Sequence, residues 1–184
     1  MSAQTEVSTA RARFEASLTA LDVAVTRTAP ADFESTLREI VSEPVVGTAL
    51  PFDDVSLPNW VDDAPTPATL ESATTGITPA CLGIADYGSV VLPSTPEGAE
   101  PVSLFSDLHV AVLRESDLVA DMQTAIEHLA PRLRDGESAI VATGPSATAD
   151  MGALVTGAHG PKDVHVVLLR DGSADVDSEV AADE

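Results

Sequence analysis

The chain has 184 residues, enough for one domain with a hydrophobic core, and its 44% hydrophobic content excludes a disordered acidic tail protein. Its 30 acidic residues outnumber 9 basic ones, and the formal charge of −21 should repel nucleic acid and anionic membranes. The single cysteine, Cys81, cannot form an internal disulfide or hold an iron–sulfur cluster alone, and no apolar run is long enough to span a bilayer.

The acidic residues are spread along the chain, and lysine is depleted, since Lys162 is the only one. This pattern predicts a halophilic source, where molar salt screens self-repulsion over a Debye length of about 3 Å. An ordinary acidic protein is the alternative. The first residues lack the basic-then-apolar order of a signal peptide, so we expect a cytoplasmic protein.

Apolar residues recur at three- and four-residue steps from Val7 to Leu21 and predict an amphipathic helix, followed by a short strand at Val23–Val25. Asp32 is a predicted cap for a second helix, which Pro44 stops before a strand at Val45–Val46. This alternation of strands and helices predicts an α/β fold with a mainly parallel sheet flanked by helices.

Proline and aspartate dominate residues 51–68, which predicts a surface loop that Trp60 pins to the body of the protein. Strands are then expected at Ile77–Ile84 and Ser89–Leu92. Between them, Gly88 can adopt the positive φ that a tight turn needs.

The second half of the chain begins with a predicted central strand at Leu108–Leu113. Asp117 is the predicted cap of a helix that ends before Pro131. Two further apolar runs, 139–143 and 164–169, complete the expected central strands of the sheet.

A polar segment separates those last two strands and is long enough for a crossover helix. Gly144 would allow close backbone approach, and Ser146 or Thr148 could cap the helix with Asp150 in its first turn. The same groups could instead hold a carboxylate or phosphate at the helix N-terminus, in the ligand crevice of an α/β sheet. Cap and ligand site both remain open, but no Lys-Ser/Thr pair follows the glycine as a P-loop requires.

His159, Gly160 and Lys162 belong to a Gly-Pro turn in which the histidine could be a general acid or base or a donor to an oxyanion. Alternatively, His159 only shapes a surface loop. Asp86 lies at a predicted strand end beside Gly88, where a carboxylate could act as base or nucleophile or simply form the turn.

Two other histidines, His109 and His165, lie in predicted strands and are expected to be structural. None of the histidines has the spacing of a known metal cage, so no metal site is predicted.

Several ordered blocks resemble the signature of LUD-domain proteins, in the lactate-utilisation protein C branch. The blocks of the segment described above are Gly144-Pro145-Ser146, Thr148-Ala149-Asp150 and His159-Gly160-Pro161. The preceding blocks, in order, are Gly76-Ile77-Thr78, Gly83-Ile84-Ala85, Gly88 to Leu92 and Asp107 to Val112. The clear match covers residues 75–169; we expect residues 1–170 to form a single domain and 171–184 an acidic disordered tail.

The resemblance implies a fold similar to ribose-5-phosphate isomerase and CoA transferases. It also implies a role in oxidising L-lactate to pyruvate beside a cysteine-rich subunit and a ferredoxin-like iron–sulfur subunit. On this view the chain is a non-redox subunit or accessory protein without a cofactor of its own, its partners carry the iron–sulfur clusters, and it could bind a small carboxylate.

The alternative is a free-standing isomerase- or CoA-transferase-like enzyme that acts on a small organic acid or its activated ester, with Asp86 as base or nucleophile. Phosphate and CoA substrates usually require basic residues, and only Lys162 lies near the signature loops. The candidate catalytic residues are Asp86 and His159. The candidate ligand-binding residues are Gly144, Ser146, Thr148, Asp150, Gly160 and Lys162.

Overall fold

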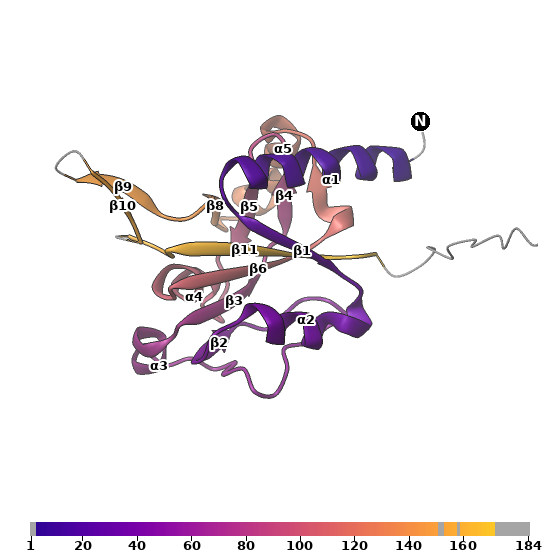
Figure 1. The fold of residues 1–184 in the computed structure, drawn as a ribbon. Helices are drawn as coiled ribbons and strands as arrows, with labels where there is room; N and C mark the ends of the chain where they lie inside the picture. The colour runs from indigo at the N-terminus through magenta and orange to yellow at the C-terminus, as the bar shows by residue number, and fades with distance from the viewer. Residues whose placement is uncertain (1–2, 151–152, 158, 172–184) are drawn as a thin grey trace, which may run out of the picture.

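A parallel sheet of five strands forms the centre of the protein (Figure 1), in a computed structural model that describes residues 3–150, 153–157 and 159–171. The strand order is β1-β11-β6-β3-β2, and every neighbouring pair is parallel. The strands are β1 (Ala24–Thr28), β2 (Val45–Gly47), β3 (Thr75–Pro79), β6 (Leu108–Arg114) and β11 (Asp163–Leu169). The α/β architecture with a mainly parallel sheet, predicted from the alternation of elements, is confirmed.

Five α-helices accompany the strands in the described part of the chain. They are α1 (Ala3–Ala20), α2 (Phe33–Ile40), α3 (Pro67–Ser72), α4 (Ala99–Phe105) and α5 (Met122–Arg134). Short 3-10 helices follow β1, at η1 (Pro30–Asp32), and β6, at η2 (Glu115–Asp117). None of the helices among the described residues is long and apolar enough to cross a membrane.

The predicted start of the fifth helix is wrong. Asp121, not Asp117, is its N-cap, and the Asp121 carboxylate accepts a hydrogen bond of 2.8 Å from the backbone N–H of Thr124. The intervening Leu118–Val119 pairs with β4 as a short strand. In this strand its backbone groups are hydrogen-bonded, whereas the N–H groups of a first helical turn have no partner within the helix. Pro131 lies inside the last turns of α5, which continues to Arg134.

A smaller sheet packs beside the parallel one, in the order β7-β4-β5-β8. Its strands are β4 (Leu82–Ile84), β5 (Ser89–Pro93), β7 (Leu118–Val119) and β8 (Ala139–Thr143). The prediction that 139–143 is a central strand is wrong, since β8 pairs only with β5, antiparallel, at the edge of this sheet. Ile140 and Ala142 pack on the core while Val141 is 42% exposed, which is the alternation of a strand covered on one face.

Alternating side chains of the central strands divide the core into two layers. Val110 and Val112 of β6 pack with Phe33 and Leu37 of α2 on one face of the parallel sheet. On the other face, the intervening residues of β6 pack against α1 and the smaller sheet, in a cluster that includes Phe14, Leu18, Val90, Leu92, Ala111 and Leu113. This two-residue period is that of a strand buried on both faces.

The expected crossover helix after β8 is absent from the described residues. The chain instead forms a hairpin of β9 (Ala147–Asp150) and β10 (Ala153–Thr156), which projects from the body of the protein (Figure 1). The segment has few large apolar residues with which a helix could cover a sheet, whereas its β-branched residues, such as the paired Thr148 and Val155, favour strands. The predicted tail lies outside the described residues from position 172 onward.

Candidate functional site

A cavity of about 260 Å³ brings together the loop after β8 and the turn that contains His159. We call it the His159 hollow. Its lining includes Thr143, Gly144, Pro145, Ser146, His159, Gly160 and Pro161 from these two segments, with Leu92, Ser103, Leu104, His109, Ile140, Ala142 and Val164 from the body of the protein. Four of the predicted site residues therefore meet in one place: Gly144, Ser146, His159 and Gly160.

The His159 hollow lies at the amino ends of the parallel strands. His109 is the second residue of β6, Val164 is the second residue of β11, and both line the cavity. The predicted position at the carboxyl ends is wrong because β8 does not belong to the parallel sheet. The loop that follows β8 therefore lies at the amino ends of β6 and β11, not at their carboxyl ends.

Backbone hydrogen bonds hold the two segments together. The N–H of Ser146 donates to the carbonyl of Pro161 at 3.0 Å, and the N–H of Gly157 donates to the carbonyl of Ser146 at 2.8 Å. Gly144 turns the chain out of β8 with a φ of +67°, a conformation that favours glycine. A Cβ on Gly160 would lie 3.1 Å from the Cβ of Ser146, so the segments approach closely because position 160 has no side chain.

The prediction that Ser146 or Thr148 caps a helix is wrong, because β9 rather than a helix follows. Ser146 remains at the hollow, whereas Thr148 pairs with Val155 in the hairpin and does not line the cavity. Asp150 pairs with Ala153 at the end of β9, so it lies in a strand and not in a first helical turn.

Lys162 follows the turn but does not line the hollow. Its Nζ lies 2.8 Å from the Oδ1 of Asp107, and both side chains are more than half exposed. The lysine charge is therefore directed to a surface carboxylate, and the lining of the hollow contains no lysine or arginine.

Asp86 does not line the hollow and lies in the turn between β4 and β5. Its Oδ1 accepts a hydrogen bond of 2.7 Å from Arg13 of α1. Asp86 and His159, the two predicted catalytic residues, therefore do not line one cavity. The β4–β5 turn nevertheless lies next to the hollow, since Ser89 at the end of this turn pairs with Thr143 of the lining.

His109 contributes to the hollow although its place in a strand predicts a structural role. Its ring is buried, and Nε2 lies 2.8 Å from the Oγ1 of Thr78. Burial lowers the pKa of His109 to about 4, so the imidazole is neutral at pH 7. The sequence offers only a weak signal for this placement: His109 stands at the start of its strand, next to Gly76 of β3.

Hydroxyl and imidazole groups give the hollow its chemistry. Ser146, Thr143 and the exposed His159 can donate or accept hydrogen bonds, and the Thr143 hydroxyl already pairs with that of Ser89 at 2.7 Å. Such a set suits a small polar molecule or a carboxylate held by hydrogen bonds. Among the described residues no group of three or more His, Cys, Asp or Glu side chains is placed to hold a metal ion.

Known proteins provide a comparison. The family model of the LUD domain matches residues 62–169. Lactate utilization protein C of Deinococcus radiodurans is 29% identical over 126 residues, which cover 67% of this chain and 59% of that protein. The protein of the same name from Bacillus velezensis is 32% identical over 129 residues, covering 65% of this chain and 54% of its own length. The chain thus spans little more than half the length of these curated relatives.

One solved structure is similar in fold. It is the crystal structure of a DUF162 family protein from Deinococcus radiodurans, which matches with a TM-score of 0.69 at 19% identity. The match covers 89% of this chain and 98% of that one, so the two chains share a fold over nearly their whole matched length.

Proposed function

Because the chain belongs to the LUD-domain family, we propose that it acts in lactate utilisation, as a non-redox component of a system whose iron–sulfur subunits oxidise L-lactate to pyruvate. The names of its curated relatives support the lactate role. The non-redox assignment rests on composition: two electrons must leave lactate, and a single cysteine cannot hold an iron–sulfur cluster alone. The clusters are therefore assigned to cysteine-rich and ferredoxin-like partners.

The His159 hollow is the part of this chain that we assign to the function. The observation that carries this assignment is that Ser146 and His159, from segments on either side of the hairpin, line one cavity. Its hydroxyl and imidazole groups would bind the carboxylate of a small organic acid or the backbone of a partner subunit.

The first experiment tests whether lactate oxidation requires the iron–sulfur subunits. The chain purified alone should not reduce an artificial electron acceptor with L-lactate. When purified from its own cells in molar KCl, it should retain iron–sulfur subunits, because salt screens the repulsion between acidic partners. Turnover of L-lactate by the isolated chain would contradict the proposal.

The second experiment tests the hollow. His159→Ala and Ser146→Ala should slow growth on L-lactate while the melting temperature stays within roughly 3 °C of wild type, the range expected when no buried packing is lost. His128→Ala is the matched control, since His128 is exposed on α5 and does not line the hollow. If growth follows only the loss of folded protein, the hollow is structural.

The alternative enzyme, an isomerase or CoA transferase that uses Asp86, is less well supported by the geometry. The Asp86 carboxylate is engaged by Arg13, outside the hollow. Asp86→Asn should therefore leave growth on L-lactate unchanged.

A further inference from the structure

A second cavity, of about 320 Å³, lies at the other end of the parallel sheet. We call it the Arg132 cavity. Pro79 is the last residue of β3, residues Ala49–Pro51 follow β2, and both segments line it. The cavity thus lies at the carboxyl ends of parallel strands, where open α/β sheets commonly bind their ligands. The signature residues of the His159 turn play no part in it.

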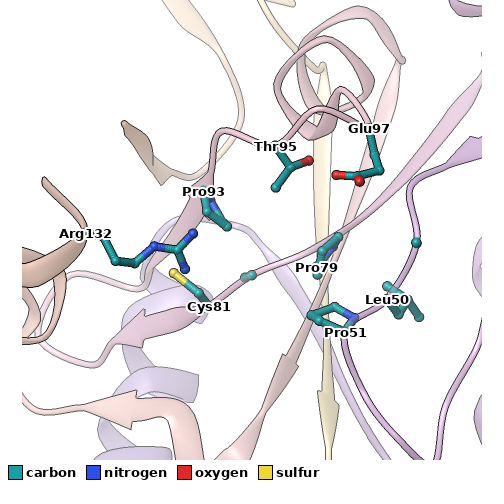
Figure 2. A pocket seen from close by; sticks show the side chains of 10 residues that line it. Leu50, Pro51, Pro79, Cys81, Pro93, Thr95, Glu97 and Arg132 are labelled. Atoms are coloured by element: carbon teal, nitrogen blue, oxygen red, sulfur yellow. The ribbon is translucent and has the colours of Figure 1, made fainter. Parts of the chain in front are cut away.

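Two polar walls of opposite charge face each other across this cavity (Figure 2). Arg132, near the end of α5, points its guanidinium toward Cys81 and the interior. Thr95 and Glu97, on the loop before α4, point their side chains in from the other side. A ligand that spans the cavity would meet a cation at one end, and a hydroxyl with a carboxylate at the other.

The surface between the polar walls is apolar. It is formed by Leu50, Pro51, Pro79 and Pro93 (Figure 2). Pro79 and Pro93 are buried, and both end strands, so this surface is held by the two sheets and not by mobile side chains. A few well-placed polar groups on a largely apolar lining are typical of small-molecule sites.

Arg132 is held in place by a neighbour that lies outside the cavity. Its Nε donates a hydrogen bond of 2.6 Å to the Oε2 of Glu137, which fixes one edge of the guanidinium. The terminal nitrogens are directed to the cavity side, and a guanidinium presents paired donors that match a carboxylate.

A buried hydroxyl belongs to the residue next to the lining, although Thr48 itself does not line the cavity. Thr48 directly precedes Ala49 of the lining and is 1% exposed. Its Oγ1 has no hydrogen-bond partner among the described residues. Buried hydroxyl groups in folded proteins nearly always have a partner.

We propose that the Arg132 cavity binds an organic acid that carries a carboxylate at one end of a short aliphatic chain and a hydrogen-bond donor at the other. The carboxylate lies against Arg132, the aliphatic part lies on Pro79 and Leu50, and the donor, a hydroxyl or an ammonium, contacts Glu97 and Thr95. This site is independent of the lactate role and of the His159 hollow.

Cys81 provides a direct reporter of occupancy, because it is the only cysteine and lines the cavity. Its rate of alkylation by iodoacetamide, a neutral reagent, is measured in high salt at a fixed, mildly alkaline pH. The probes are γ-hydroxybutyrate, γ-aminobutyrate, butyrate, which lacks the donor, and n-butanol, which lacks the carboxylate. One of the first two should slow alkylation in a saturable way, and the better of them identifies the donor as hydroxyl or ammonium.

Two variants test the polar walls against a matched control. Arg132→Gln should weaken protection of Cys81 by the carboxylate probes roughly tenfold. Glu97→Gln should make the donor-bearing probe protect Cys81 no better than butyrate does. Arg134→Gln, the matched control, removes a charge from the same helix outside the cavity. This control should keep the protection. Melting temperatures verify that each variant is folded.

Three results would overturn the proposal. Alkylation that none of the probes slows would show that the cavity binds no such acid. Equal loss of protection in Arg132→Gln and Arg134→Gln would show a general charge effect. Protection by butyrate equal to that by both donor-bearing probes would remove the assigned role of Glu97 and Thr95.

Discussion

Arg27 and Glu115 connect the edge strand β1 to the turn after the central strand β6, across the intervening strand β11. The Glu115 carboxylate accepts hydrogen bonds from both Nε and Nη2 of Arg27, and the Nη1 of Arg11 in α1 lies 3.5 Å from its Oε2. The glutamate side chain is only 8% exposed. This ion-pair cluster therefore ties α1, β1 and β6 together at one end of the sheet.

Glu115→Ala should destabilise the protein by about 3 kcal/mol, because it removes a buried carboxylate that accepts two hydrogen bonds from Arg27 and pairs with Arg11. In a chain of this size, that corresponds to a fall in melting temperature of roughly 6–12 °C. The matched control is Glu137→Ala, which breaks an exposed pair with Arg132 and should cost less than about 1 kcal/mol. Equal losses in the two variants would contradict the special role of the Arg27–Glu115 pair.

His109 should make stability depend on pH. Burial lowers its folded pKa from 6.5 to about 4, so the unfolded chain takes up a proton between these values while the folded protein does not. The full stability is therefore present above pH 6.5, and about 3 kcal/mol is lost as the pH falls to 4. Urea unfolding across this range measures the loss.

The variant His109→Gln isolates this contribution. Its stability should be lower at neutral pH but should decline less steeply than that of wild type on acidification, since the buried titrating group is gone. His128→Gln, at an exposed position on α5, should retain the wild-type slope. Parallel slopes for wild type and His109→Gln would contradict the prediction.

Trp60 anchors the Pro- and Asp-rich loop to α2. Its Nε1 donates to the Oε1 of Glu34 at 3.1 Å, and the Arg38 guanidinium carbon lies 4.9 Å from the ring centroid. Trp60→Ala should cost about 2 kcal/mol and make residues 51–66 sensitive to protease, because the loop covers the core beside α2. Trp60→Phe keeps most of the packing and should cost less than about 1 kcal/mol. Resistance of the alanine variant to cleavage would show that other contacts hold the loop.

Salt should stabilise the protein if its acidic surface is adapted to the molar salt inside a halophilic cell. The excess of 21 negative charges repels itself in dilute buffer, and molar KCl screens this repulsion. Relief of about 2 kcal/mol would raise the melting temperature by roughly 4–8 °C. Melting curves from dilute buffer to molar KCl measure the effect, with sucrose as an uncharged control for exclusion effects. A flat response to KCl would contradict the halophilic interpretation.

Local periodicity predicted β6 and β11 well, because their apolar runs reflect burial on both faces of the sheet. The single strand expected at Ile77–Ile84 is wrong, since the structure divides it between β3 of the parallel sheet and β4 of the smaller sheet. The pairing of β8 was not predictable in the same way. Its short apolar run suits either sheet, and only the partner β5, about 50 residues away, decides which one it joins.

The candidate sites show the same division between local and long-range information. Ser146 and His159 could be placed together because both flank the segment that leads into β11. Their place at the amino ends of the strands depends on the pairing of β8 and was therefore predicted wrongly. Arg132, Glu97 and Cys81 were not predicted as a site, since they come from three separate segments and form no motif.

The hydrogen bond between Thr78 and His109 lies between the two cavities. Thr78 directly precedes Pro79 of the Arg132 cavity, and His109 lines the His159 hollow. A partner seated over the hollow would leave the opposite end of β3 open, so both sites can be occupied at once. Any effect of an acid in one cavity on the affinity for a partner at the other must be matched by an equal effect in return. The bond itself is a direct contact between a residue next to one cavity and a residue that lines the other.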